Sequence, residues 1–184
     1  MAGNHLESLV AEWYELLGYF VRRNVQVGKR ARGGHECELD IVAFHPAQRS
    51  LVHIEPSLDS YSWEKREARY AKKFIAGSKY IPGLFPGMAI PKHIEQIALF
   101  VYGGGKGRER IAGGRVMFIR EFMAEIRAAI RHRKVGSEAI PEELPLLRTL
   151  QFAVEYWGKE EHSGYQGTAA NAASRRGRAA TLAQ

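Results

Sequence analysis

Two short apolar runs, each carrying an acidic residue, constrain the fold of this chain most. The first extends from Glu36 to Phe44 (ECELDIVAF) and the second from Leu51 to Ser57 (LVHIEPS), with only HPAQRS between them. Short runs rich in Val, Ile and Phe favour buried β-strands, and a connection of this length is typical of a hairpin. The sequence therefore predicts two adjacent antiparallel strands that carry carboxylates among apolar residues.

Further elements are predicted on both sides of this hairpin. Asn4 and Glu7 form a capping box before an amphipathic helix, and a strand is expected over Tyr19–Val27. A helix over Ser62–Gly77 then leads to a buried strand over Ile94–Tyr102. A strand reached through a helical crossover lies parallel to its neighbour. The order predicts an α/β fold, a mixed sheet flanked by helices.

The rest of the chain predicts additions to this sheet. GGGKGRERIAGG is typical of a flexible loop, and RVMFI, which follows it, is typical of a fifth strand. The segments after RVMFI predict two C-terminal helices. Residues 1–157 are expected to form one domain, whereas residues 158–184 are poor in large aliphatic side chains, which predicts a disordered tail. The first residues are typical of an amphipathic helix and no apolar run approaches the ~20 residues of a membrane span. We therefore expect a cytoplasmic protein that has no membrane contact.

The charge of the chain indicates an anionic partner. The formal net charge is +7 over 184 residues, an excess of cations that favours nucleic acid. One basic segment is the turn at Lys29, Arg30 and Arg32 before the first acidic strand. A second is the helix over residues 62–77, and the alternative for that helix is a solvated face. A third basic face carries Arg127, Arg131, Arg133 and Lys134 and is either solvated or bound to nucleic acid.

Strand alternation brings the acidic residues of the two apolar runs together. It puts Asp40 on one face of its strand and the apolar residues on the other: Leu39, Ile41 and Ala43. Glu55 faces the same way as His53, which we expect to be buried and hydrogen-bonded, with metal ligation as the alternative. If the strands pair, Asp40 and Glu55 converge, and two close carboxylates repel unless a proton or a cation lies between them. Oxygen ligands of this kind suit Mg²⁺ or Mn²⁺; the alternative is a pair of solvent-facing strand residues.

These residues and their order resemble the PD-(D/E)xK nuclease superfamily, which includes restriction endonucleases and Holliday-junction resolvases. The resemblance covers residues 4 to 102 and implies a restriction-endonuclease-like αβββαβ core with extra C-terminal helices. It implies that Asp40 and Glu55 bind Mg²⁺ or Mn²⁺ and that Glu7 lies near the metal-bound water. It further implies hydrolysis of duplex or branched DNA by a protein that often acts as a homodimer.

The chain departs from the family pattern at Ser57, where the family carries the lysine of its Glu-x-Lys motif. Some members place this lysine on the following helix, and here we assign the catalytic cation to Lys65 or Lys72. The remaining cations of this helix are expected to contact nucleic acid: Arg66, Arg69 and Lys73. The alternative is a nuclease-like domain that has lost catalysis and binds nucleic acid or a protein partner. A small-molecule enzyme on the same sheet has no supporting motif.

Overall fold

The first six main elements follow the predicted order in a computed structural model that describes residues 4–103 and 107–157. The helices are α1 (His5–Leu16), α2 (Trp63–Tyr80), α3 (Ile119–Ile130), α4 (Pro145–Trp157) and the short 3-10 helix η1 (Ile81–Leu84). The strands are β1 (Phe20–Lys29), β2 (His35–His45), β3 (Ser50–Ser57), β4 (Glu95–Phe100), β5 (Arg110–Ile111) and β6 (Gly114–Phe118). The predicted tail over 158–184 lies outside the described residues.

One mixed sheet of six strands organises the described chain, in the order β1-β2-β3-β4-β6-β5. β1, β2 and β3 form an antiparallel meander, whereas β4 runs parallel to β3, and β6 parallel to β4. The predicted parallel strand after the helical crossover is therefore present. Within the segment expected to be a flexible loop, Arg110–Ile111 forms β5, because these residues pair with the start of β6.

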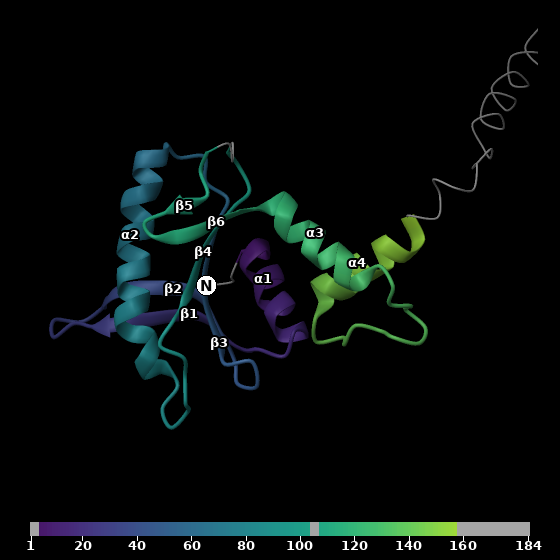
Figure 1. Ribbon diagram of the computed structural model, residues 1–184, viewed down its shortest axis with the longest axis horizontal. Coiled ribbons are helices and arrows are strands. Elements are labelled where there is room, and N and C mark those ends of the chain that lie inside the picture. The colour runs from purple at the N-terminus through teal and green to yellow at the C-terminus, as the bar shows by residue number, and fades with distance from the viewer. Residues whose placement is uncertain (1–3, 104–106, 158–184) are drawn as a thin grey trace, which may run out of the picture.

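Helices cover both faces of the sheet (Figure 1). α2 lies on one face, while α1, α3 and α4 lie on the other (Figure 1). The core on the second face includes Val10, Ile54 and Phe122. On the α2 face, Tyr70 and Phe74 pack against β4 and β6. Ser62 caps the start of α2, since its side chain accepts a hydrogen bond from the backbone N–H of Lys65. No helix among the described residues is long and apolar enough to cross a bilayer.

A buried glutamate ties the C-terminal helices to the core. Oε2 of Glu12, on α1, accepts hydrogen bonds from the backbone N–H groups of Leu146 (2.9 Å) and Leu147 (3.0 Å). These N–H groups lie in the first turn of α4 and have no partner within that helix. The carboxylate of Glu12 therefore caps α4 and holds it against α1.

The simple alternation predicted for β2 is interrupted at Asp40. Alternation placed Leu39 and Ile41 on the same face, but Leu39 packs with Val42 on the α2 side and Ile41 packs on the α1 side. The β1–β2 register puts Asn24 opposite Asp40, and Asn24 has a left-handed backbone with φ of 53°. A left-handed residue within a strand disturbs the regular pleat of the pair. The prediction for Leu39 was therefore wrong.

Candidate active site

The structure brings Asp40 and Glu55 together, as strand alternation predicted. Ile41 pairs with Ile54, and continuing this register by one residue places Asp40 opposite Glu55. The backbone N–H of Asp40 donates to Oε1 of Glu55 at 3.1 Å. Both residues are buried, with 8% and 1% of their surfaces exposed. They lie between two interior strands rather than at the outer edge of the sheet.

Lys73 on α2 supplies a cation to both carboxylates. Its Nζ lies 2.7 Å from Oδ1 of Asp40 and 2.6 Å from Oε2 of Glu55. Lys65 and Lys72, the lysines assigned to the catalytic role from the sequence, make neither of these contacts. Lys72 is exposed, and Lys65, in the first turn of α2, has its Nζ 5.9 Å from the centre of the Tyr61 ring.

Helix spacing explains why Lys73 reaches the pair. The buried positions of α2 include Arg66, Tyr70 and Gly77, separated by four and then seven residues, so they lie along one side of the helix. Lys73 falls three residues after Tyr70 and four before Gly77, on the same side, which faces the sheet. This spacing is visible in the sequence, but Ala68 and Ile75 are apolar residues of the same helix that do not face the sheet. Both are exposed, and Ile75 is 70% exposed.

The two carboxylates and Lys73 shift one another's pKa values. Burial and the neighbouring charge of Glu55 raise the pKa of Asp40 to about 7. Burial acts against the charge of Lys73, but Glu55 and Asp40 outweigh it and raise the pKa of this ammonium. Lys73 is therefore charged at neutral pH, where Asp40 is close to its titration point.

Glu7 lies within electrostatic reach of this pair. Its backbone N–H donates to Oδ1 of Asn4 at 2.9 Å, and the Asn4 amide donates to Oε1 of Glu7 at 2.6 Å, which forms the predicted cap of α1. Burial and the charge of Asp40 raise the pKa of Glu7. A third carboxylate thus approaches the site from the helix on the other face of the sheet.

His53 orients Glu55 from within the same strand. It is fully buried, and its Nε2 lies 2.8 Å from Oε1 of Glu55. Burial lowers the pKa of His53 to about 3, so the ring is neutral and Nε2 carries the proton that it donates to the carboxylate. Nδ1 has no hydrogen-bond partner among the described residues and lies against Gly77, where an added Cβ would be 2.4 Å away. The predicted buried, hydrogen-bonded histidine is confirmed.

A partly buried ionic cluster surrounds Ser57, at the position where the nuclease pattern has its lysine. The Ser57 hydroxyl donates to the Asp59 carboxylate, which also accepts from Arg66 Nε at 3.0 Å and from a terminal nitrogen of Arg69 at 2.7 Å. The Arg66 guanidinium lies 4.4 Å from the centre of the Phe100 ring. Arg66 was expected at a nucleic-acid surface. It is instead buried, because its guanidinium donates hydrogen bonds to Asp59. Arg69 is paired with the same carboxylate, although 39% of its side chain stays exposed.

A groove opens beside Lys73, between α2 and the β1–β2 hairpin. It has a volume of about 560 Å³, and its lining includes Gln26, Cys37, Arg69, Lys72 and Lys73. The hairpin reaches beyond α2 (Figure 1). The predicted basic turn forms the tip of this hairpin, where its cations are exposed: Lys29, Arg30 and Arg32.

The donor set of the site fits a hard divalent cation. No cluster of three or more His, Cys, Asp or Glu side chains arranged as metal ligands occurs within residues 4–103 and 107–157. Mg²⁺, however, is commonly held by one or two carboxylates together with water and substrate phosphate. Both oxygens of Glu55 already contact His53, the Asp40 N–H or Lys73. Asp40 is therefore the main candidate ligand, with Glu55 beside it.

The chain matches no protein-family model and no curated protein.

Proposed function

We propose that this protein is a metal-dependent nuclease that hydrolyses phosphodiester bonds in DNA. The observation that carries the proposal is the contact of the Lys73 ammonium with both Asp40 and Glu55. The nuclease pattern requires two carboxylates and a cation at one place. Here the cation comes from the helix after the acidic strands, as in the family members whose lysine has moved there.

Each side chain has a distinct role in this proposal. Asp40, with Glu55 beside it, would hold Mg²⁺ or Mn²⁺, and such an ion would supply a Lewis acid for the attack of water on the phosphate. The ammonium of Lys73 orients the attacking water and balances negative charge on the phosphate. His53 holds Oε1 of Glu55, and the Tyr70 hydroxyl donates to the Glu55 backbone carbonyl at 3.0 Å. The His53 contact restrains the carboxylate, and the Tyr70 contact fixes the backbone of Glu55.

A second candidate function is a nuclease-like domain that binds nucleic acid without cutting it. Ser57 favours it, because the motif lysine is missing. The position of Lys73 favours it too, since its ammonium already neutralises the carboxylate pair without a metal. The two candidates differ in their need for metal, because binding alone needs no divalent ion at the pair.

A cleavage assay with matched variants tests the proposal. Labelled duplex, single-stranded and branched DNA, and RNA of the same sequences, are incubated with the protein and Mg²⁺ or Mn²⁺. We expect cleavage of at least one DNA substrate, and a loss of about 10³-fold for Asp40→Asn. Glu64→Gln, which removes an exposed acid from α2, is expected to cleave like the wild type. Binding without cleavage in every metal would support the second candidate. Undiminished cleavage by Asp40→Asn would refute the role given to Asp40.

A further inference from the structure

A groove lined by cations lies between α3 and α4. These two helices lie on the opposite face of the sheet from α2 (Figure 1). The volume of the groove is about 580 Å³. Four cations line it: Arg127, Arg131, Arg133 and Lys134. Its apolar lining is small, with Ala124, Ala128 and Val154 as its members. We call it the α3–α4 groove.

Two side chains of α4 hold the segment that carries Arg133 and Lys134. Nε2 of the buried Gln151 donates to the backbone carbonyls of Arg133 (3.3 Å) and Glu138 (3.0 Å). Oε2 of Glu155, which also lines the groove, accepts from the backbone N–H of Val135 at 2.7 Å. The segment after α3 is thereby fixed against α4, so the cations are presented on a preorganised surface rather than on a free loop.

The positive charge of the groove is not consumed by ion pairs within the described chain. Among residues 4–103 and 107–157, none of the four cations forms a salt bridge. Arg127 and Arg131 lie near the C-terminal end of α3, where cations favour the helix dipole. That effect does not account for Arg133 and Lys134, which come after α3 has ended. Four cations facing one acidic residue leave a strongly anion-attracting surface.

We propose that the α3–α4 groove binds the phosphate backbone of nucleic acid. Arg127 and Arg131 are one turn apart, about 6 Å along the helix axis, a distance that spans roughly two phosphates of one strand. Among the described residues that line the groove, none is aromatic or a large apolar anchor of the kind that protein interfaces usually bury. The groove belongs to the C-terminal helices, outside the αβββαβ core. It would therefore hold nucleic acid at a place separate from the carboxylate pair and independent of cleavage.

Salt-dependent binding in EDTA tests this proposal apart from the nuclease activity. The full chain is titrated onto fluorescently labelled duplex DNA at several salt concentrations, and binding is followed by fluorescence anisotropy. Arg127→Gln/Arg131→Gln removes two groove cations, so the slope of log K against log salt should become shallower by about 2. Arg133→Gln/Lys134→Gln should do the same from the other wall of the groove.

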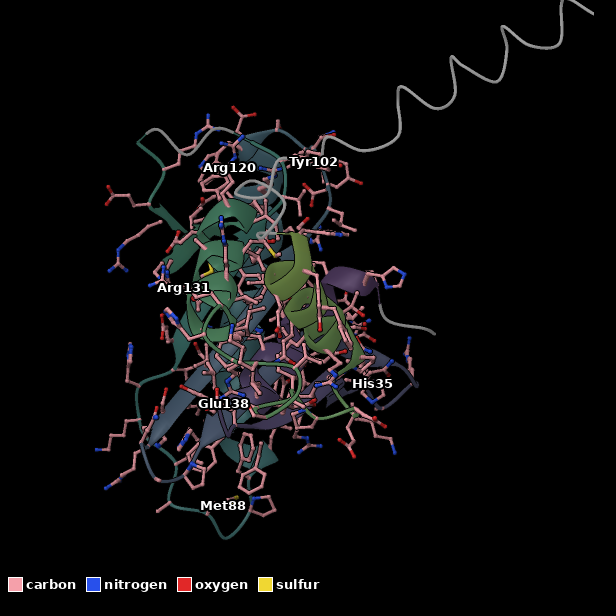
Figure 2. The ribbon with its side chains drawn as sticks, turned by 90° about the vertical axis from the view of Figure 1, so that its right-hand side faces the viewer. His35, Met88, Tyr102, Arg120, Arg131 and Glu138 are labelled. Carbon is pink, nitrogen blue, oxygen red and sulfur yellow. The ribbon has the colours of Figure 1, made fainter. Side chains whose placement is uncertain are left out.

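A charge-matched control separates the groove from net charge. Arg120 lies about 16 Å before Arg131 along α3, and Figure 2 labels both residues. Arg120→Gln/Lys92→Gln removes two exposed cations outside the groove and should leave the slope unchanged. An unchanged slope in both groove variants, or an equal loss in the control, would overturn the proposal. If the groove variants show the shallower salt slope but the protein cuts no DNA, the proposal for the α3–α4 groove stands and only the proposed nuclease activity is refuted.

Discussion

Nζ of Lys73 lies 2.6 Å from Oε2 of Glu55, although the two residues are eighteen positions apart in the chain (73 − 55 = 18). The nuclease pattern places its lysine two positions after the glutamate, on the same strand. Here the position two residues later is Ser57, which is bound to Asp59. The ammonium that contacts Glu55 belongs instead to Lys73 on α2, the helix that packs on this face of the sheet. Four predictions follow from the contacts around this pair.

Lys73 should be the lysine of α2 on which cleavage depends. Lys73→Met removes the ammonium and leaves Asp40 and Glu55 facing each other, so we expect cleavage to fall by about 10²–10³-fold. Lys65→Met and Lys72→Met remove the two lysines first assigned to this role and should cleave close to the wild-type rate. Single-turnover cleavage with circular dichroism as a folding check measures the difference. Equal losses in all three variants would show that only the charge of the helix matters.

The stability of the metal-free protein should depend on pH through Asp40 and His53 in opposite directions. The pKa of Asp40 is raised to about 7 from an ordinary value of 3.8. Between these values the folded state holds a proton that the unfolded chain has lost, so this contribution to stability falls as pH rises. The pKa of His53 is lowered to about 3 from 6.5, so between those values its contribution rises with pH.

The two contributions should nearly cancel in the wild type between about pH 4 and about pH 6.5, and variants should separate them. His53→Gln should make the free energy of unfolding fall with pH, relative to the wild type, by up to about 1.4 kcal/mol per pH unit. Asp40→Asn should make it rise by a similar amount. Urea unfolding in EDTA across this range measures both slopes, and slopes of the same sign would contradict the assignment.

The stability of the fold should depend on the absence of a side chain at Gly77, because His53 packs against this residue. An added Cβ would lie 2.4 Å from Nδ1 of His53, so Gly77→Ala should cost about 1–3 kcal/mol in the free energy of unfolding. Gly83→Ala is the control, because nothing lies within 4 Å of its added Cβ. His53→Ala makes room for the new methyl group, so the cost of Gly77→Ala should shrink in that background. If Gly77→Ala costs as much in the His53→Ala background as in the wild type, Gly77 is required by the helix backbone and not by its contact with His53.

Placing the family's lysine at position 57 should destabilise this protein. Ser57 is buried, and Asp59 joins it to Arg66 and Arg69. A lysine there would add a buried ammonium that competes with two arginines for one carboxylate, so Ser57→Lys should cost about 3 kcal/mol or more. Ser57→Ala loses only a hydrogen bond and should cost about 1 kcal/mol. Thermal unfolding compares them, and a Ser57→Lys protein as stable as Ser57→Ala would contradict the role given to the cluster.

Strand alternation was enough to predict that Asp40 and Glu55 meet. The two strands are joined by a tight turn, so their pairing depends on neighbouring residues of the chain. The same alternation failed for Leu39, because Asn24 adopts a left-handed backbone in the neighbouring strand β1. Nothing in the order of apolar and polar residues marks Asn24 for that conformation.

The sequence by itself determined the order of elements, the acid pair and the buried His53, because alternation and helical periodicity are local properties of the chain. Only the tertiary structure decided which cation completes the site. Arg66, Arg69, Lys72 and Lys73 have similar chemistry and close spacing, and the rotation of α2 against the sheet separates them. Packing of Tyr70, Phe74 and Gly77 against the sheet sets that rotation. It turns Lys73 to the carboxylates, Arg66 to Asp59 and Lys72 to the surface.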